Sequence, residues 1–303
     1  MTVAGALPRR VLILGLGCAG RALALHLRSL GVTVEGSVRD PTAAPGDGIA
    51  RHRLHPDHHP DTALLDAIAR ADTVLCSVPP DADGDPALRL LAPALRASPA
   101  LRWVGYLSST AVYGDRDGGW IDEQSSADAT DATAARRLLA ESQWRALAHE
   151  RGIASAVFRL PGLYGRGRNA LVQLAQGRAR HIVRPGLVFN RLHVEDLATA
   201  VSAAMRLPTH DALYLPADDE PAPSQDVLAH AARLGGFALP PAMAWDDPAL
   251  APSLRRFYAA SKRIDSRGTR EALQWQPRFR TYREGLRDAW EAGDGLTAAD
   301  AAR

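Results

Sequence analysis

Lysine is almost missing from this chain. Lys262 is the only lysine among 36 basic residues, and all the others are arginines. Arginine stays charged and cannot act as an amine of lowered pKa, so any chemistry that needs a titrating amine has one candidate. Cysteine is equally scarce, with only Cys18 and Cys76. Two cysteines exclude a disulfide scaffold, and their places in or beside apolar runs are typical of reduced thiols, which predicts a cytoplasmic protein.

Long apolar runs and excess charge are also lacking. Near the N-terminus the longest apolar stretch, Val11 to Gly17, is far shorter than the ~18 residues of a membrane span, so we expect no membrane insertion. The 36 basic and 34 acidic side chains nearly balance at a net charge of +2. No basic block is long enough to neutralise a row of phosphates, which makes nucleic acid an unexpected partner.

Apolar residues make up 46% of the chain, enough for a sizeable core. Short apolar runs alternate with segments of helical periodicity, a pattern that predicts a doubly wound parallel sheet of the Rossmann-like α/β class. Six strands are predicted, at Arg10–Gly15, Val32–Val38, Ile49–Leu54, Thr73–Val78, Arg102–Leu107 and Ile153–Leu160. The helices are predicted over Cys18–Leu30, Asp61–Ala71, Pro86–Ala97 and Asp131–Arg151.

Beyond Tyr164 the sequence becomes rich in glycine, arginine and proline, with only isolated helical segments. We therefore divide the chain into a dinucleotide-binding domain, residues 1–165, and a smaller, irregular C-terminal substrate lobe, residues 166–303. An alanine-rich helix over Val194–Leu207 is expected to return to the first domain. The two parts are thus interleaved along the sequence.

A glycine pattern follows the first predicted strand. Gly15, Gly17 and Gly20 form G-x-G-x-x-G where a strand meets a helix. The first glycine permits a tight turn, the second lets the backbone approach a pyrophosphate, and the third lets helix and strand pack closely. With Cys18 and Ala19, which open the helix, these residues are predicted to hold a dinucleotide.

The end of the second strand bears on the choice of cofactor. An acidic residue there binds the ribose hydroxyls of NAD, whereas a cation pairs with the extra phosphate of NADP. Arg39 stands at the strand exit with Ser37 as a hydroxyl donor, and Asp40 follows. We favour NADP, with NAD left open by Asp40 and by the alternative that Arg39 is a solvated surface charge.

Five motifs in order make the chain similar to a known family. They are the glycine turn, Ser108–Gly114 (SSTAVYG), Arg159–Gly165 (RLPGLYG), Arg191–Leu197 (RLHVEDL) and Leu273–Pro277 (LQWQP). Together they resemble the NAD-dependent epimerase/dehydratase family, the extended short-chain dehydrogenases/reductases. The glycine pattern is closer to atypical members, the YeeZ-like branch. The resemblance implies cofactor contacts at Ser77, Val78, Ser108, Arg137, Pro161 and Leu163.

In that family a serine after the fifth strand binds the reacting oxygen, and a Tyr-x-x-x-Lys pair on the next helix transfers the proton. The serine position corresponds to Ser109, whereas the tyrosine and lysine positions fall on Thr133 and Arg137. Threonine cannot act as an acid near neutral pH, and arginine cannot titrate. The usual proton-transfer pair is therefore missing from its place.

Two tyrosines are candidates to replace the tyrosine of the missing pair. Tyr258 and Lys262 match Tyr-x-x-x-Lys literally, and on one helix they would share a face, but they lie in the irregular lobe. We interpret them as a packed tyrosine on a surface helix, with Lys262 open to an anionic substrate. Tyr113 or a water chain is predicted to replace the missing phenol beside Ser109, with the alternative that the Tyr113 phenol closes the loop by a hydrogen bond.

Thr110, Arg191 and His193 are predicted to contact the substrate, because relatives use these positions in that way. For His193 the alternative is a helix-start residue bonded to the backbone. Four histidines, at 52, 55, 58 and 59, follow no ordered ligand spacing, so no metal site is predicted. The helix over Asp131–Arg151 is expected to pack its face of Ala135, Leu138, Leu139, Ser142 and Ala146 on the sheet or on a second subunit, which leaves a homodimer open.

The resulting hypothesis is an NAD(P)-dependent oxidoreductase or epimerase that transfers a hydride to or from a carbonyl or carbinol carbon of a small substrate. Sugar nucleotides enter only through the family resemblance. The alternative is a protein that binds NADP(H) without chemistry and reports redox state to a partner, which the missing Tyr/Lys pair keeps open.

Overall fold

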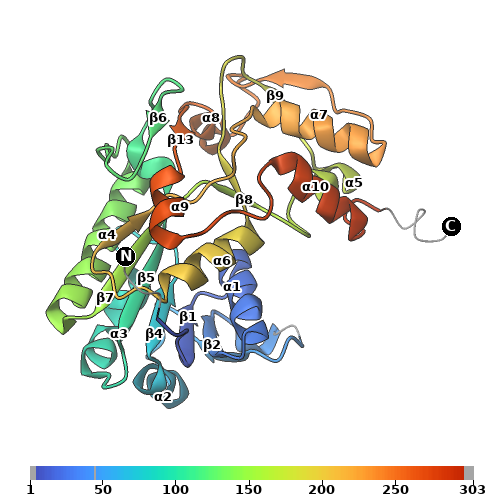
Figure 1. The fold of residues 1–303 in the computed structure, drawn as a ribbon. Helices are drawn as coiled ribbons and strands as arrows, with labels where there is room; N and C mark the ends of the chain where they lie inside the picture. Colours follow the sequence, from blue (N-terminus) through green and yellow to red (C-terminus); the bar gives the residue numbers. More distant parts are fainter. Residues whose placement is uncertain (1–4, 44–45, 297–303) are drawn as a thin grey trace.

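A seven-stranded parallel sheet forms the centre of the protein. The computed structural model describes residues 5–43 and 46–296. The strand order is β11-β7-β5-β4-β1-β2-β3, and every neighbouring pair is parallel. The strands are β1 (Arg10–Leu14), β2 (Thr33–Val38), β3 (Ala50–Arg53), β4 (Thr73–Cys76), β5 (Trp103–Ser109), β7 (Ala154–Leu160) and β11 (Ala212–Tyr214). The prediction of a doubly wound Rossmann-like fold is confirmed (Figure 1).

Helices cover both faces of this sheet. α1 (Cys18–Ser29) and α6 (Val194–Ala204) share one apolar core with one face, and α2 (Thr62–Arg70), α3 (Pro86–Ala97) and α4 (Ala132–Arg151) share another core with the opposite face. β4 and β7 are buried along their whole length, as continuous apolar strands in a sheet covered on both sides must be.

Local capping explains where the helices begin. Asp61, Asp85 and Asp131 each stand before a helix and accept a backbone N–H of its first turn with the side chain. Gly152 ends α4 in the left-handed conformation, which glycine adopts without a steric penalty. These signals are local in sequence, and the predicted helix starts agree with the structure within one residue.

Two features of the sheet layer differ from the prediction. The seventh strand, β11, has only three residues and was not predicted. The buried side of α4 is formed by Ala140, Glu141, Trp144 and Leu147, whereas Leu139 on the predicted face is 42% exposed. The predicted packing face of this helix was therefore wrong. The alternative, a second subunit on the exposed face, stays a prediction.

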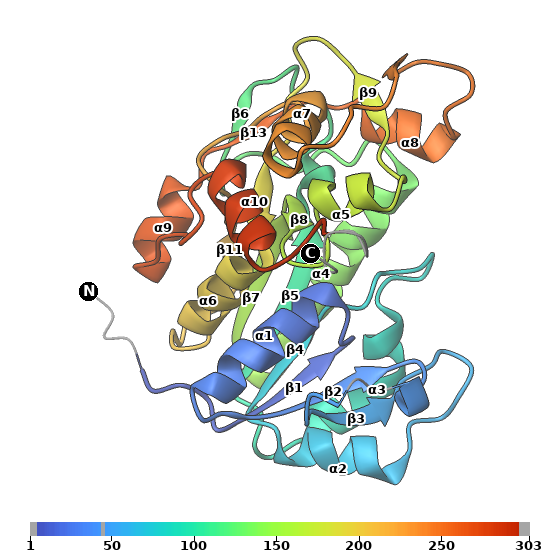
Figure 2. The ribbon, with the colours of Figure 1, turned by 90° about the vertical axis from the view of Figure 1, so that its right-hand side faces the viewer.

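The remaining segments build a lobe above the sheet (Figure 2). It contains the two-stranded pairs β8 (Gly162–Tyr164) with β10 (Arg191–His193), β9 (His181–Val183) with β12 (Ala242–Ala244), and β6 (Trp120–Ile121) with β13 (Arg263–Ile264). Its helices are α5 (Ala170–Ala175), α7 (Ser224–Gly235), α8 (Pro252–Phe257), α9 (Arg267–Leu273) and α10 (Tyr282–Glu291), and the 3-10 turns of the chain are η1 (Pro41–Ala43) and η2 (Thr110–Tyr113).

The two parts of the chain are interleaved. α6 packs on the sheet beside α1, and β11 adds a strand to it, although both follow lobe segments in the sequence. Trp275 also joins this core, and its indole N–H donates to the Thr199 hydroxyl on α6 at 2.8 Å. The outer ends of the two predicted domains, residues 1–4 and 297–303, lie outside the described residues. Within residues 5–43 and 46–296, no helix is long and apolar enough to cross a bilayer.

Candidate cofactor and substrate site

The carboxyl ends of the parallel strands gather the predicted site residues at one edge of the sheet. Gly15 follows β1, Arg39 follows β2, Ser77 follows β4, Ser109 ends β5 and Pro161 follows β7. Open α/β sheets bind their ligands at this edge, where the loops leave the strands. The lobe lies above the same edge (Figure 2).

The turn after β1 is tied to its neighbouring strands. Gly15 has φ +90, a conformation that favours glycine. Its N–H donates to the Ser37 hydroxyl at 3.0 Å, and the Ser77 hydroxyl donates to its carbonyl at 2.9 Å. A Cβ on Gly15 would also approach the backbone nitrogen of Val78 to 3.3 Å. Ser37 is fully buried, so the structure does not support the prediction that its hydroxyl donates to the cofactor: it braces the turn instead.

The start of α1 can accept an anionic group. Gly17 stands at the N-cap with no side-chain cap, and no acidic residue occupies the first turn, which Cys18 and Ala19 open. A Cβ on Gly17 would meet nothing within 4 Å, whereas a Cβ on Gly20 would lie 2.5 Å from the Gly15 carbonyl oxygen. Uncapped backbone N–H groups at a helix N-terminus, with open space in front of them, fit the pyrophosphate of a dinucleotide.

Two arginines lie at the ends of β2 and β3. Arg39 is exposed directly after β2, and Arg53 ends β3 opposite Val38. Asp40 is engaged in its own turn, because its carboxylate accepts the backbone N–H of Thr42 at 3.0 Å and the Thr42 hydroxyl at 2.6 Å. These bonds hold the pKa of Asp40 below its usual range. The Asp40 carboxylate is thus bonded to Thr42, and it is not paired with Arg39 or Arg53.

Ser109 has the geometry of a donor to a ligand. It is half-buried at the end of β5, and its hydroxyl oxygen accepts the N–H of Ala111 at 3.2 Å. Among the described residues this hydroxyl donates to no group, so its hydrogen is free for a substrate oxygen. The Thr110 hydroxyl, by contrast, donates to the Leu160 carbonyl at 3.3 Å and closes the gap between β5 and β7.

Ser108 points to the other side of the strand, as neighbouring residues of a strand do. Its hydroxyl donates to the Glu141 carboxylate at 2.5 Å, and the residue is buried. Arg159 of β7 donates three hydrogen bonds to the Glu141 carboxylate, at 3.1 Å, 3.3 Å and 2.8 Å. The side chain of Ser108 is therefore committed to an internal network, and it is not free for the predicted cofactor contact.

Sequence reasoning missed this buried ion pair, although a signal was present. Arg159 is the one charged residue of the strand Ala154–Leu160, which is buried along its whole length, and a buried guanidinium requires a partner. Glu141, on the sheet side of α4, is that partner. The pair joins α4 to the strands beside Ser109.

The phenol of Tyr113 is fully buried. Its hydroxyl donates to the Asp122 carbonyl at 3.3 Å, and the Arg159 guanidinium lies over its ring at 4.9 Å. Burial raises the pKa of Tyr113, which makes its proton harder to release. The structure therefore favours the alternative, a tyrosine that closes the loop by its phenol hydrogen bond.

The positions of the missing proton-transfer pair lie on the first turns of α4. Thr133 is exposed, and Arg137 is half-buried without a hydrogen bond or ion pair to any described residue. Arg137 is thus available for a ribose or phosphate, and its cofactor contact stays a prediction. Pro161 and Leu163, both half-buried after β7, lie at the same edge, and their cofactor contacts stay predictions.

Tyr258 and Lys262 do not share a helix face. α8 ends at Phe257, and the Tyr258 hydroxyl bonds to the Ser224 hydroxyl at 2.8 Å. Tyr258 is buried, as the packed-tyrosine interpretation expects, but it lies just past a helix.

His193 stands directly before α6 and caps it, as the alternative of a helix-start residue bonded to the backbone predicts. Its ring Nδ1 accepts the Glu195 N–H at 3.3 Å, and the side chain is fully buried beside Tyr164 and Phe279. Burial lowers its pKa to about 4. A buried ring that caps a helix cannot also reach a substrate, so the structure does not support the predicted contact.

The lowered pKa of His193 predicts a pH dependence of stability. The pKa of His193 is about 4 in the folded chain, whereas an unfolded histidine protonates near pH 6.5. The free energy of unfolding therefore falls as the pH falls between these two values. The loss reaches about 3 kcal/mol at the acid end. His193→Asn keeps the cap and does not titrate. Urea unfolding from pH 7.5 to 4.5 should show the stability difference between wild type and variant shrinking with falling pH; a constant difference would contradict this.

Arg191 lies deeper than a substrate contact at the surface. It donates to the carbonyls of Phe189 at 3.0 Å and Ala222 at 2.9 Å. Burial lowers the pKa of its guanidinium, and burial raises the pKa of nearby Asp218 to about 8, against the opposing effect of Arg191. Arg191 thus joins lobe segments, and its contact with a substrate stays a prediction.

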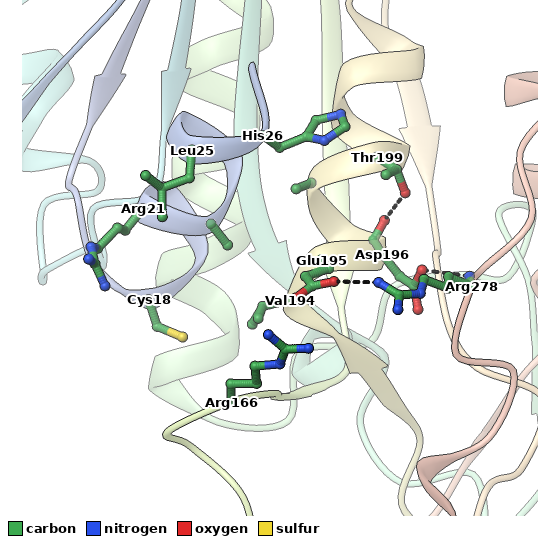
Figure 3. A pocket seen from close by; sticks show the side chains of 12 residues that line it. Cys18, Arg21, Leu25, His26, Arg166, Val194, Glu195, Asp196, Thr199 and Arg278 are labelled. Carbon is green, nitrogen blue, oxygen red and sulfur yellow. Dashed lines mark hydrogen bonds and ion pairs between the residues drawn. The ribbon is translucent and has the colours of Figure 1, made fainter. Parts of the chain in front are cut away.

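A groove of 510 Å³ lies between α1 and α6, beside the start of α1 (Figure 3). Two ion pairs involve its lining residues: Arg278 with Glu195 at 3.2 Å, and Arg166 with Asp288 at 2.9 Å. Cys18 is its one member from the predicted cofactor set. In the described ranges, no three His, Cys, Asp or Glu side chains form a group that could hold a metal ion.

The fold defines an α/β protein of Rossmann type, with a glycine turn that fits a dinucleotide. The model of the NAD dependent epimerase/dehydratase family matches residues 11–213, so the chain belongs to this family.

Several relatives are similar over most of the chain. A 3-diazoavenalumate denitrifying reductase from Streptomyces sp is 29% identical over 308 residues, covering 91% of this chain and 99% of that protein. Protein YeeZ from Escherichia coli (strain K12) is 29% identical over 218 residues, covering 68% and 76%. Among solved structures, a functionally unknown conserved protein from Silicibacter pomeroyi is 39% identical, with TM-score 0.84 and coverage of 94% and 99%. MoeE5 in complex with UDP-glucose and NAD is 21% identical, with TM-score 0.75 and coverage of 93% and 97%, which shows the shared fold.

Proposed function

We propose that the protein is an NADP(H)-dependent oxidoreductase that transfers a hydride to or from a carbonyl or carbinol carbon. The observation that carries this proposal is the free Ser109 hydroxyl at the same sheet edge as the uncapped start of α1. Family membership and the reductase among the relatives support it. Small carbonyl compounds are the first substrate class to test, and sugar nucleotides the second, because MoeE5 was solved with UDP-glucose.

The residues of this chain divide the work between binding and polarisation. The backbone at Gly17 and the first turn of α1 would hold the pyrophosphate, and Arg137 would contact the ribose or a phosphate. The cofactor supplies a hydride donor or acceptor when bound. Ser109 would donate its hydroxyl hydrogen to the substrate oxygen and stabilise the negative charge that develops there.

Ser109→Ala is expected to lower the rate of NADPH consumption about 100-fold, because one hydrogen-bond donor to the reacting oxygen is lost. The measurement is absorbance at the nicotinamide band with a panel of aldehydes, ketones and UDP-sugars. Thr110→Ser, which keeps the hydroxyl bonded to Leu160, is the matched control and should retain activity. Equal activity of wild type and Ser109→Ala would refute the role of Ser109 as the donor to the substrate oxygen.

The alternative function, an NADP(H)-binding redox reporter without chemistry, rests on the absent Tyr/Lys pair at Thr133 and Arg137. Both functions predict that NADPH raises the melting temperature. Only the enzyme predicts consumption of NADPH with a carbonyl of the panel. If calorimetry detects no binding of NADPH or NADH at millimolar concentration, both the enzyme and the redox reporter are refuted.

Arg39→Ala is expected to weaken NADPH binding about 10-fold and to leave NADH binding unchanged, because one charge-assisted contact to the extra phosphate is removed. Fluorescence titration with each nucleotide measures this. Arg9→Ala, an exposed arginine before β1 at the opposite sheet edge, is the matched control. An equal effect of Arg39→Ala on both nucleotides would instead assign the residue to general charge attraction.

A further inference from the structure

The described site lacks an obvious proton donor. Tyr113 donates to a carbonyl from a buried position, and Thr133 and Arg137 stand where the family carries its tyrosine and lysine. Carbonyl reduction nevertheless requires a proton at the oxygen that Ser109 would bind. The proton therefore comes either from water or from another segment near the ends of β5 and β7.

The segment that carries the single lysine is fixed to the loop after β5. Ser261 donates its N–H to the Asp115 carboxylate at 2.7 Å, and its carbonyl accepts the N–H groups of Arg116 at 3.0 Å and Gly118 at 3.1 Å. The next residues continue into β13, which pairs with β6. This loop begins directly after Tyr113, so the lobe brings residues 261–264 to the chain that leaves Ser109.

The other side of the segment is fixed to the chain that follows β7. The Asn190 side chain donates to the Lys262 carbonyl and accepts the Ile264 N–H, each at 2.8 Å. The Asn190 carbonyl accepts the N–H of Gly162, next to Pro161, at 3.2 Å. Lys262 thus lies between the loops of β5 and β7, the strands that pair Ser109 with Leu160.

The direction of the side chain follows from the extended backbone. Asn190 spans Lys262 and Ile264 as a neighbouring strand would, and residues two apart on an extended chain lie on the same side. Ile264 packs in one apolar cluster with Val112 and Tyr113 of η2. Lys262 therefore lies on the same side of this chain as Ile264, the residue that packs against η2.

The charge of Lys262 has no partner in the described chain. It is half-buried, and its ammonium forms no hydrogen bond or ion pair with residues 5–43 or 46–296. Burial lowers its pKa; the Asp115 carboxylate opposes this and the Arg116 guanidinium adds to it. Asp115 is itself engaged by the backbone N–H groups of Ser261 and Asp117. The ammonium is therefore not committed to another side chain of the described residues.

We propose that Lys262 is the catalytic proton donor of this site, supplied by the C-terminal lobe. This inference rests on the proposed function. In the reduction the carbonyl carbon accepts a hydride from the reduced nicotinamide, which is thereby oxidised, and the carbonyl oxygen accepts a proton from the Lys262 ammonium. A C–H bond and an O–H bond form, the carbonyl π bond breaks, and the neutral amine regains its proton from water.

The single lysine makes a direct test simple. In protein labelled with ¹³Cε-lysine, Lys262 gives one resonance, and labelled Lys262→Arg should give none. The pKa of Lys262 is measured from this resonance in the NADP⁺ and NADPH complexes, with saturation checked by calorimetry. The oxidised ring carries a positive charge and the reduced ring does not, so we expect the pKa to be about one unit lower with NADP⁺.

Binding of both nucleotides with the same Lys262 pKa in the two complexes would overturn the proposal and leave the proposed function standing. Failure of either nucleotide to bind would overturn both. With a carbonyl that wild type reduces, Lys262→Met and Lys262→Arg should each lower kcat about 100-fold with unchanged affinity for NADPH, because neither side chain can donate a proton near neutral pH. Activity retained by Lys262→Arg would also overturn the proposal.

Discussion

Gly17→Asp is expected to weaken binding of either nicotinamide nucleotide about 1000-fold and to leave the melting temperature of the free protein unchanged. The loss corresponds to about 4 kcal/mol, because the new carboxylate would stand where two phosphates are predicted to lie. The fold should tolerate the change: Gly17 has an ordinary φ of −75, and a Cβ there would meet nothing within 4 Å. Calorimetric titration and thermal unfolding measure the two effects.

The neighbouring glycine supplies the contrast. At Gly20 a Cβ would lie 2.5 Å from the Gly15 carbonyl oxygen, so Gly20→Ala must shift the turn or the helix and should lower stability even without nucleotide. Gly17→Ala, with a small neutral group in open space, should bind nucleotide more tightly than Gly17→Asp. Unchanged affinity in Gly17→Asp would show that the turn holds no pyrophosphate.

The strands of the central sheet could be predicted because their signals are local. Parallel strands covered on both faces are continuous apolar runs. In the sequence, mainly apolar runs of this kind mark β1, β4, β5 and β7. β11 could not be found from the sequence in this way. It has three residues, two of them only half-buried, and it is a strand because β7 offers it a free edge.

The edge that carries the site followed from the topology, but the direction of individual side chains did not. Ser108 and Ser109 are identical neighbours in sequence, yet one bonds to a buried glutamate and the other keeps a free hydroxyl. His193 and Ser37 were expected to meet ligands, and both are buried by elements distant in sequence. Their surroundings depend on tertiary packing, which residue spacing does not report.

The unusual position of Lys262 had one signal in the sequence, its being the only lysine. The literal Tyr-x-x-x-Lys match contains Lys262, the proposed proton donor, but Tyr258 bonds to Ser224 and no helix joins the two residues. The bonds of Asn190 and Asp115 to residues 261–264 bring the lysine to the sheet edge. Contacts over such sequence separations appear only in the folded chain.

Glu141→Ala is expected to lower the free energy of unfolding by about 3 to 5 kcal/mol, because it leaves the Arg159 guanidinium buried without its carboxylate. Glu141 is 1% exposed and Arg159 is 6% exposed, so water cannot replace the lost partner without opening the core. The Ser108 hydroxyl also loses its acceptor. Urea unfolding at pH 7 followed by circular dichroism measures the change.

The matched control lies on the same helix. Glu150 pairs with Arg96 at 2.9 Å at the surface, and both side chains are half exposed, so Glu150→Ala should cost less than about 1 kcal/mol. The double variant Glu141→Leu with Arg159→Met removes both charges and should recover much of the loss, since no unpaired charge then remains in the core. If Glu141→Ala unfolded at the same urea concentration as Glu150→Ala, the pair would not hold α4 to β5 and β7, and the free Ser109 hydroxyl would owe its placement to the strand alone.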